Sequence, residues 1–347
     1  MRSDIGSSGT FAGLGAKPEP LHASSRFSDA RHLILEITGP SAADLEAWVS
    51  ANVAWIEQQL HQHGALLFRG GQIDTPEKLA RFAAFLANDF PTFKEESSPR
   101  LHMGGTVFSS TEYPKEYPIQ LHCEYSYAAE WPMKLFFGCV RPPASGGETP
   151  VASTRAVLQR LRASTKAAFR ERQIMYVRNY RQGLGVSWQD AFGSNDRGHV
   201  ERHCANAGIH VEWLPGNALR TRQVGAAILR HPQTGQEVWF NHAFFFNVGS
   251  LEPRELREFF LDDEEDALAT QTFFGDGTRI PDDIIEELRE AFNEKTSCTW
   301  RRGDVLLVDN MLTAHGREPF SGPRSIAVVM AEKCSRKDLI AAEVAAT

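Results

Sequence analysis

The sequence lacks two features that would point to whole classes of protein. None of its 347 residues belongs to an apolar run of about 18 residues, the length that a membrane-spanning helix needs. It also has no excess of basic residues, since 37 Lys and Arg stand against 44 Asp and Glu, for a formal net charge of -7. A nucleic-acid binder typically carries a basic patch. We therefore expect neither a membrane nor a nucleic acid among the partners of this chain.

Cysteine is scarce, and the five cysteines form no CxxC pair. An odd number of unpaired cysteines indicates reduced thiols in a cytoplasmic protein rather than a disulfide framework. The first twenty residues are rich in Gly, Ser and Pro and lack the continuous apolar segment of a secretory signal. We expect residues 1–26 to form a flexible tail and residues 27–347 to form one domain.

Three common catalytic signatures are also missing. The chain contains no HExxH zinc-peptidase motif, no GxSxG nucleophile elbow and no GxxxxGK[ST] phosphate loop. The candidate chemistry must therefore come from residues that are spread along the chain.

Helical and strand-like segments are mixed along the sequence. Apolar periodicity and capping signals predict helices over 41–63, from Thr75-Pro76 onward, over 153–169 and over 281–292. Apolar runs predict strands over 65–68, 135–140, 226–229, 238–246, 305–308 and 325–330. Irregular mixing argues against a doubly wound sheet and favours a mixed α+β fold, a double-stranded β-helix (cupin-like jelly roll) wrapped by helices. Residues 176–250 are expected to form an insertion over its mouth.

The tripeptide His122-Cys123-Glu124 is one of three His-x-Glu triplets. With 12 His and 44 acidic residues, random placement would give roughly one or two such triplets, so the motif alone decides nothing. On a strand, His122 and Glu124 would face the same side, about 6.6–6.8 Å apart, and could reach one metal ion. Cys123 would point to the opposite side.

The other two triplets are weaker candidates. His199/Glu201 lies in a polar stretch with no core strand beside it, and His210/Glu212 could belong to a short alternating strand. For any single histidine, a structural role with hydrogen bonds is the more common one.

A third ligand and a co-substrate site can be sought near the C-terminus. His315 follows the apolar run 305–308, so we expect it just beyond the end of a core strand. Two histidines and one carboxylate leave three adjacent positions open on Fe(II). Arg324 begins the next predicted strand, where its planar guanidinium could bind a carboxylate with help from the Thr149 hydroxyl. Spacing alone explains Arg324 equally well as part of a surface salt bridge.

Two alternatives stay open on these residues. Zinc accepts two histidines and one glutamate together with a water molecule, which would make the chain a metal hydrolase and leave Arg324 and Thr149 without a role. The third hypothesis is a jelly-roll binding protein without catalysis.

Eight segments in the same order resemble the taurine dioxygenase-like (TauD/TfdA) superfamily of Fe(II)/2-oxoglutarate oxygenases, and most closely its SyrP-like branch. They lie between residues 64 and 332 and read GALLFRG (64–70), STEYP (110–114), LHCEYSY (121–127), WPMKLFFGCV (131–140), GGETPVAS (146–153), VRNYRQGLGVSWQ (177–189), HPQTGQEVWFN (231–241) and VLLVDNMLTAHGREPFSGPR (305–324).

This resemblance implies a role for each candidate residue. His122, Glu124 and His315 would be the iron ligands, and Thr149 and Arg324 would contact 2-oxoglutarate. Related halogenases lack the carboxylate ligand, so its presence here implies oxygen transfer to a C–H bond, or the related desaturation and epoxidation. The reaction would consume O2 and 2-oxoglutarate and release succinate and CO2.

The position of the arginine departs from that in taurine dioxygenase itself. There it lies further along the chain, which here would fall near Val329 or Met330, and neither side chain can bind a carboxylate. The resemblance therefore implies a shorter loop that turns Arg324 to the same pocket.

Members of the SyrP-like branch hydroxylate amino acids, some of them tethered to carrier proteins in antibiotic biosynthesis. The resemblance therefore implies an amino-acid-like substrate, free or carrier-bound. Candidate substrate contacts are Ser110, Glu112, Asn179, Trp188, Arg222 and Asn241. Glu112 would suit a substrate amine, and Arg178 or Arg222 a carboxylate.

Overall fold

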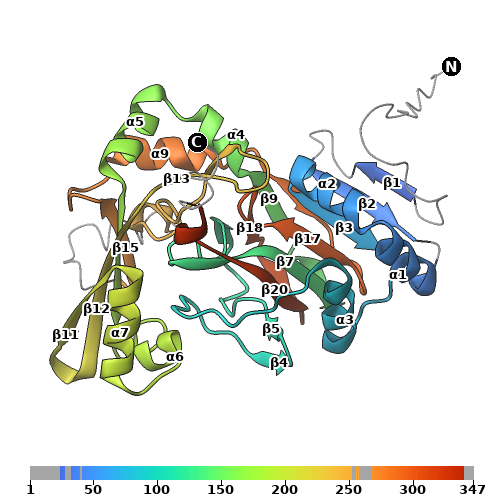
Figure 1. Ribbon diagram of the computed structural model, residues 1–347, viewed down its shortest axis with the longest axis horizontal. Helices are drawn as coiled ribbons and strands as arrows, with labels where there is room; N and C mark the ends of the chain where they lie inside the picture. The colour runs from blue at the N-terminus through green and yellow to red at the C-terminus, as the bar shows by residue number, and fades with distance from the viewer. Residues whose placement is uncertain are drawn as a thin grey trace.

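The computed structural model describes residues 24–27, 33–39, 41–251, 255, 257 and 268–339. Two sheets form its centre (Figure 1). The strands of the larger sheet are β1 (Ser24–Phe27), β2 (Ile34–Thr38), β3 (Ala65–Arg69), β4 (His102–Gly104), β5 (Val107–Ser109), β7 (Glu130–Arg141), β17 (Val305–Asp309) and β20 (Ser325–Ser335). The strands of the smaller sheet are β6 (Ile119–His122), β9 (Thr149–Ser153), β16 (Thr296–Cys298) and β18 (Thr313–Arg317).

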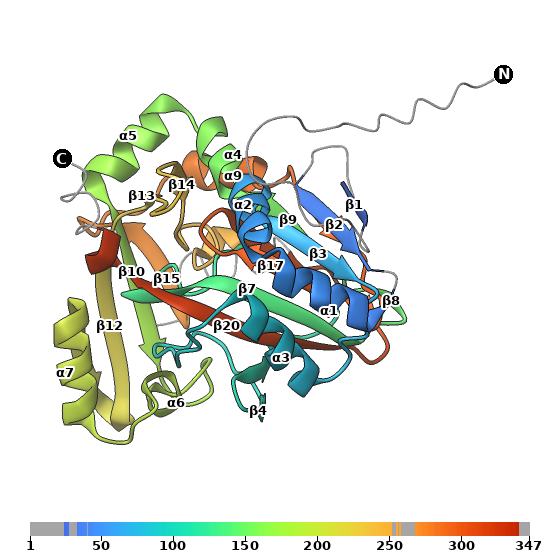
Figure 2. The same ribbon diagram turned by 45° about the vertical axis from the view of Figure 1, so that its right-hand side comes forward.

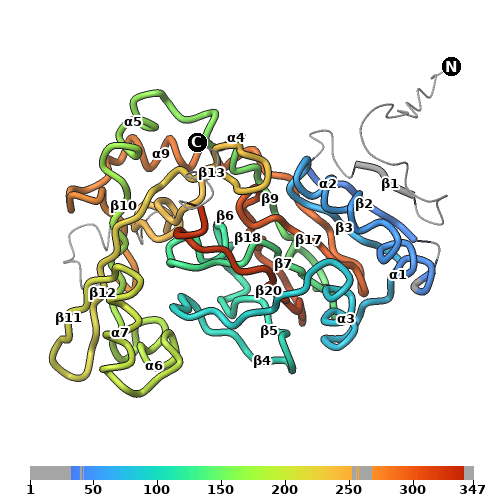
Figure 3. The backbone as a smooth tube through the Cα atoms, in the orientation of Figure 1, coloured from blue at the N-terminus to red at the C-terminus, as the bar shows by residue number. Residues whose placement is uncertain are grey.

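Strands that are far apart in the sequence are neighbours in both sheets. The spatial orders are β1-β2-β3-β17-β7-β20-β5-β4 and β16-β9-β18-β6, and every pair except β2 with β3 is antiparallel. The backbone tube in Figure 3 shows β6, β7, β18 and β20 gathered in the middle of the molecule. This is the jelly-roll core that the strand pattern predicts.

The larger sheet is buried on both faces, which explains its continuous apolar runs. In β20, Ile326, Val328 and Met330 face one core cluster, whereas Val329 and the alanines beside it face another. Successive side chains on a strand point to opposite faces. Arg324, directly before β20, lines the same inner cavity as Ile326 and Val328, whereas Val329 lies on the helix-covered side.

Three helices cover the outer face of the larger sheet, as Figure 2 shows: α1 (Ala42–Ala51), α2 (Val53–His63) and α3 (Pro76–Leu86). The predicted start of α3 is confirmed, since the Thr75 hydroxyl accepts a hydrogen bond from the Lys78 amide and Pro76 is the first helical residue. The single helix predicted over 41–63 is wrong. It breaks at Asn52, whose side chain donates to the Trp48 carbonyl and ends α1.

Two further expectations are corrected in the same way. The helix predicted over 153–169 is divided into α4 (Thr154–Arg160) and α5 (Ala163–Arg172), because Leu161 and Arg162 have extended backbone angles. The strand predicted over 238–246 is limited to β14 (Glu237–Trp239), which pairs with β13 (Ile228–Arg230). The aromatic residues that follow β14 pack into the core from irregular backbone. The helix predicted near the C-terminus is α9 (Asp282–Ala291).

A third sheet stands apart from α1–α3 in Figure 1. Its strands β10 (Ile174–Tyr180), β11 (Ile209–Leu214), β12 (Ala218–Gly225) and β15 (Thr270–Phe274) have the order β11-β12-β10-β15. Helices α6 (Trp188–Phe192) and α7 (Arg197–Ala207) share a small apolar cluster with it. The minor elements are β8 (Ser145–Gly146), β19 (Phe320–Ser321) and the short helices η1 (Pro215–Asn217) and η2 (Val248–Ser250).

Residues 1–23 of the predicted tail lie outside the described residues. Ser24–Phe27 form β1 and pair with β2, so the folded domain begins before residue 27. All five cysteines are free and buried. Within the described ranges, no helix has both the length and the apolar character needed to cross a bilayer.

Candidate metal centre

His122 and His315 occupy paired positions on neighbouring strands. His122 is the last residue of β6, and the register of β6 and β18 places it opposite His315. Both rings are buried, with centroids 4.6 Å apart. His315 was expected just beyond the strand that contains 305–308. Instead, a turn follows β17 and His315 lies inside the next strand, β18.

Glu124 does not lie on a strand, contrary to the prediction, because β6 ends at His122. The chain turns there, with Tyr125 in the left-handed region at φ 55°. The buried Asn310 holds this turn: its Oδ1 accepts from the Glu124 amide at 2.7 Å, and its Nδ2 donates to the Glu124 carbonyl at 2.8 Å. The turn, rather than strand alternation, brings the carboxylate to the imidazoles.

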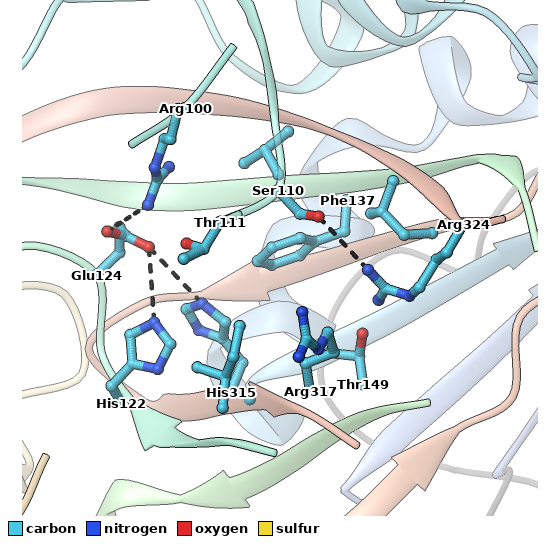
Figure 4. Close-up of a pocket in the computed structure, with 14 residues that line it drawn as sticks. Arg100, Ser110, Thr111, His122, Glu124, Phe137, Thr149, His315, Arg317 and Arg324 are labelled. Atoms are coloured by element: carbon cyan, nitrogen blue, oxygen red, sulfur yellow. Dashed lines mark hydrogen bonds and ion pairs between the residues drawn. The ribbon is translucent and has the colours of Figure 1, made fainter. Parts of the chain in front are cut away.

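The three side chains converge on one point, as Figure 4 shows. Oε2 of Glu124 lies 3.9 Å from Nε2 of His122 and 3.8 Å from Nε2 of His315. The three donor atoms lie within 4.8 Å of one another, and no other group of three such side chains occurs in the part of the chain that the structure describes. Cys123 is buried but does not belong to this group.

The other two triplets are used elsewhere. Nε2 of His199 lies 3.0 Å from the Lys94 ammonium, and Glu201 accepts a hydrogen bond from the Trp213 indole. Glu212 forms an ion pair with Arg222 at 2.7 Å. The structural surroundings therefore separate the first triplet from the other two, as the sequence analysis predicted.

The protonation of the histidines suits a metal ion. A backbone carbonyl can only accept, so the contact of 2.9 Å between His122 Nδ1 and the Gln120 carbonyl places the proton on Nδ1 and leaves the Nε2 lone pair toward Glu124. Burial lowers the pKa of His122, and it lowers the pKa of His315 to about 3. Both imidazoles are therefore neutral at ordinary pH. Among the described residues, the buried Nδ1 of His315 has no hydrogen-bond partner.

Glu124 remains ionised although it is buried. Burial alone would raise its pKa, but the neighbouring Arg100 guanidinium chiefly holds it down to about 2. An ionised carboxylate and two neutral imidazoles are the donor set of a non-haem Fe(II) site. The residues present therefore fit such an ion.

Arg100 is a site residue that the sequence analysis missed. Its Nη2 lies 2.6 Å from Oε1 of Glu124, and its Nη1 lies 3.7 Å from Sδ of Met330. It comes from the loop before β4, in the segment Ser97-Ser98-Pro99-Arg100, which carries no motif. No local pattern could have identified it, because its partner lies on another element.

The triad lines one end of a small inner cavity, and the predicted carboxylate-binding residues Thr149 and Arg324 line its other end. Arg324 donates from Nε to the Gly147 carbonyl at 3.2 Å and from Nη1 to the Ser110 hydroxyl at 3.4 Å. Thr149 is buried beside it, and its hydroxyl accepts from the Trp300 indole at 3.1 Å. Gly147 has φ +70°, and a Cβ there would lie 3.2 Å from Cδ of Arg324. The motif Gly-Gly-Glu-Thr thus leaves room for the arginine.

A second guanidinium lies at this end. Arg317 is buried on β18 and donates to the carbonyls of Tyr113, Pro114 and Tyr117. Burial, together with the charge of Arg317, lowers the pKa of Arg324 to about 10. Among the described residues, neither arginine has a carboxylate within ion-pair distance, so this end carries unbalanced positive charge. Arg317 too was missed, although it lies two residues after His315.

A cavity of about 240 Å³ reaches the triad from the side of Phe245, whose ring stacks on His122 with centroids 4.4 Å apart. Its lining is mainly apolar and hydroxyl-bearing: Ser97, Ser98, Thr111, Tyr113, Tyr117, Pro118, Ile119, Gln120, His122, Glu124, Phe245, Phe246, Ser250, Leu251, Ala269 and Thr270. Glu124 is the one formally charged side chain in this described lining.

None of the six predicted substrate contacts lines this cavity. Ser110 lies at the Arg324 end, and Glu112 lines an open groove outside it. Arg222 pairs with Glu212 on the third sheet. Three others make hydrogen bonds within the protein: the Asn179 amide donates to the Leu268 carbonyl, the Trp188 indole to the Asn217 carbonyl and the Asn241 amide to the Ala227 carbonyl.

Arg178, the other predicted carboxylate contact, is also buried. Its guanidinium donates to the Glu96 carbonyl and lies 4.8 Å from the centre of the Tyr127 ring. The cavity is lined instead by residues that sequence reasoning passed over or assigned to the core, among them Ser97, Ser98, Phe245, Phe246, Ser250 and Leu251.

Comparison with known proteins points to the same family that the sequence motifs resemble. The family described as taurine catabolism dioxygenase TauD, TfdA matches residues 31–330. The chain is 34% identical to the dapdiamide synthesis protein DdaC of Enterobacter agglomerans, over 87% of this chain and 92% of that protein. It is 28% identical to a clavaminate synthase-like protein of Arabidopsis thaliana, over 78% of this chain and 82% of that protein.

Solved structures share the fold. PvcB of Pseudomonas aeruginosa, described as an Fe, alpha-ketoglutarate dependent oxygenase from an isonitrile synthetic pathway, has a TM-score of 0.54 at 16% identity, over 92% of this chain and 96% of that one. AAD-2, solved with Mn(II) and N-oxalylglycine, has a TM-score of 0.50 at 14% identity, over 89% of this chain and 96% of that one. With a family match that spans nearly the whole chain and a triad in place at its centre, the protein belongs to the TauD, TfdA family of dioxygenases.

Proposed function

We propose that this chain is an Fe(II)- and 2-oxoglutarate-dependent oxygenase whose iron ligands are His122, Glu124 and His315. The observation that carries the proposal is the position of Glu124 Oε2, which faces the Nε2 atoms of both histidines at 3.9 and 3.8 Å. Iron bound there supplies oxygen activation, coupled to the oxidative decarboxylation of 2-oxoglutarate to succinate and CO2. Three adjacent positions stay open for this chemistry.

The Arg324 end supplies the co-substrate site of this proposal. The Arg324 guanidinium would hold the distal carboxylate of 2-oxoglutarate, with the Thr149 hydroxyl as a further partner. Arg317 would add to the positive potential while it holds the backbone of residues 113–117 over the site. A zinc hydrolase with the same triad would leave these buried cations without an anion, which disfavours that alternative.

The 240 Å³ cavity is the proposed substrate site. Its wall positions a substrate beside His122 and Glu124, and the stacked Phe245 excludes water from that side. We propose hydroxylation of an unactivated C–H bond of an amino-acid-derived substrate, free or carrier-bound. The relative DdaC is named for dapdiamide synthesis, and it supports a role in natural-product biosynthesis. Residues 245–250 belong to the segment 176–250, which we propose covers the mouth.

An anaerobic titration tests the class. Fe(II) and 2-oxoglutarate together should give a weak visible charge-transfer band, and His122→Ala should abolish it. His199→Ala is the matched control, because this histidine belongs to another triplet and contacts Lys94. Absence of the band in the parent protein at full iron occupancy would contradict the proposal.

The substrate class needs a separate screen. Free and carrier-bound amino acids would be incubated with iron, 2-oxoglutarate and air, and succinate and product masses would be measured. A product heavier by one oxygen atom supports hydroxylation or epoxidation, and a product lighter by two hydrogens indicates desaturation. Succinate formation that no amino-acid derivative stimulates would contradict the proposed substrate class.

A further inference from the structure

The two oxygens of the Glu124 carboxylate have different partners. Oε1 lies 2.6 Å from Nη2 of Arg100, whereas Oε2 lies 3.8 to 3.9 Å from the two imidazole Nε2 atoms. The ion pair is buried, since the side chain of Arg100 is 5% exposed and that of Glu124 is 10% exposed. Figure 4 shows the guanidinium on the side of the carboxylate opposite the imidazoles. One oxygen is thus held away from the point where the other meets the histidines.

Arg100 is held independently of the strands that carry the ligands. The neighbouring Leu101 exchanges hydrogen bonds with Ser109 on β5, through its amide to the Ser109 hydroxyl at 2.9 Å and through its carbonyl from the Ser109 amide at 2.8 Å. The guanidinium itself contacts Sδ of Met330 on β20. Because this support comes from the larger sheet, the arginine can resist rotation of the carboxylate.

Rotation of the carboxylate matters because the ligand is a glutamate. Its side chain has one more rotatable bond than an aspartate, and a carboxylate can bind a metal through one oxygen or both. A six-coordinate ion with two imidazoles and a one-oxygen carboxylate has three open positions. If both oxygens bound, two positions would remain, and a 2-oxo acid that chelates the metal would fill them.

We propose that Arg100 is a positioning residue that keeps Glu124 a one-oxygen ligand, so that a third position stays open beside the chelated co-substrate. This inference rests on the proposed iron and 2-oxoglutarate site. It assigns to Arg100 a task beyond balancing a buried charge. The two roles predict different results when the arginine is replaced.

Water bound to Mn(II) gives a readout that does not depend on turnover. In the presence of Mn(II), the inner-sphere contribution to water proton relaxation scales with the number of exchangeable waters on the ion. Arg100→Met should lower this contribution by about a third, from three open positions to two. Mn(II) affinity should stay within about threefold, because the second carboxylate oxygen replaces a water as a ligand.

The difference should be larger when 2-oxoglutarate is bound. In the Mn(II) protein with saturating 2-oxoglutarate, the chelating co-substrate fills two positions, so the parent should keep one water on the ion and Arg100→Met none. Arg100→Lys keeps one cationic donor and should restore part of the bound-water signal in both states. Arg178→Met is the matched control for loss of a buried arginine, because Arg178 bonds the Glu96 carbonyl and not a triad residue. It should leave the bound-water signal unchanged.

Two results would overturn the inference. Unchanged water relaxation in Arg100→Met, both without and with 2-oxoglutarate, would show that Glu124 needs no restraint. If Arg100→Met lost both Mn(II) affinity and thermal stability, and Arg100→Lys lost them to the same extent, the role of Arg100 would be merely structural. If the parent protein gives no charge-transfer band at full iron occupancy, the proposed function fails first, and the water-relaxation comparison still tests the carboxylate.

Discussion

The two ends of the buried cavity differ in how their charges are balanced. At the triad end, Glu124 already has a cationic partner in Arg100 and two neutral imidazoles beside it. At the other end, Arg317 and Arg324 lie together, with no carboxylate within ion-pair distance among the described residues, and burial lowers the pKa of Arg324 to about 10. The protein therefore completes the first end itself and leaves the second short of an anion.

This difference fits the ligands that we propose for the two ends. A metal site needs an ionised carboxylate before the metal arrives, and a neighbouring cation keeps it ionised in a low-dielectric interior. A carboxylate site needs the opposite, a buried cation whose partner is the ligand. The Gly147 carbonyl and the Ser110 hydroxyl accept hydrogen bonds from Arg324 without neutralising its charge.

The largest effect is expected from removing the anion of the balanced end. Glu124→Ala leaves Arg100 buried without its partner, which typically costs about 3–5 kcal/mol of stability. Urea unfolding of the metal-free protein should show this loss, and Mn(II) affinity should fall at least about 100-fold. Glu201→Ala, in another triplet, is the control and should change neither by a comparable amount. A metal-free Glu124→Ala protein as stable as the parent would contradict the assigned ion pair.

Removing the cation of the unbalanced end should weaken ligand binding and leave the stability of the metal-free protein nearly unchanged. Arg324→Met should weaken 2-oxoglutarate binding by about 2–5 kcal/mol, because a buried charged partner of the ligand is lost. The metal-free protein should change in stability by less than about 1 kcal/mol, since no ion pair is broken. The Kd for 2-oxoglutarate and the urea midpoint together test this. A normal Kd would mean that another residue binds the distal carboxylate.

Thr149→Val should weaken 2-oxoglutarate binding less than Arg324→Met does. The substitution removes one hydroxyl next to Arg324 and leaves the Trp300 indole without its acceptor. A single hydrogen bond contributes about 0.5–1.5 kcal/mol, so the 2-oxoglutarate KM should rise several-fold while Mn(II) binding is unchanged. Thr234→Val, on the surface turn before β14, is the control. An unchanged KM would remove Thr149 from the co-substrate site.

The smallest expected effect is on the reactivity of two buried thiols, Cys123 and Cys139. Cys123 lies between His122 and Glu124 in the sequence, and Cys139 lies on β7 near Arg324. Burial raises the pKa of both, that of Cys139 to about 12, so both stay protonated where an ordinary thiol with pKa about 8.5 ionises.

The rate of thiol labelling by a disulfide reagent should therefore stay low between about pH 8 and about pH 9.5 in the folded protein. In denaturant, all five cysteines should react. Fast labelling of Cys123 or Cys139 in the native protein at about pH 8 would show that one end of the cavity opens readily.

Local patterns predicted much of this molecule. The Thr75-Pro76 helix start, the end of α2 at Gly64 and the apolar strands of the larger sheet all follow from interactions within a few residues. They failed where a single residue interrupts a regular element, as at Asn52, or where aromatic residues pack from irregular backbone, as after β14. Burial of those rings outweighs the strand preference of their sequence.

At the candidate metal centre, the residue types could be read from the sequence: two histidines, one glutamate and a downstream arginine in an ordered series of motifs. Their geometry depends on the tertiary structure. Glu124 reaches the imidazoles through a turn held by Asn310, and Arg100 arrives from a loop that no pattern marks. The physical reason is range. Capping and alternation act within a few residues, whereas the pairing of buried charges depends on which distant segments the sheets bring together.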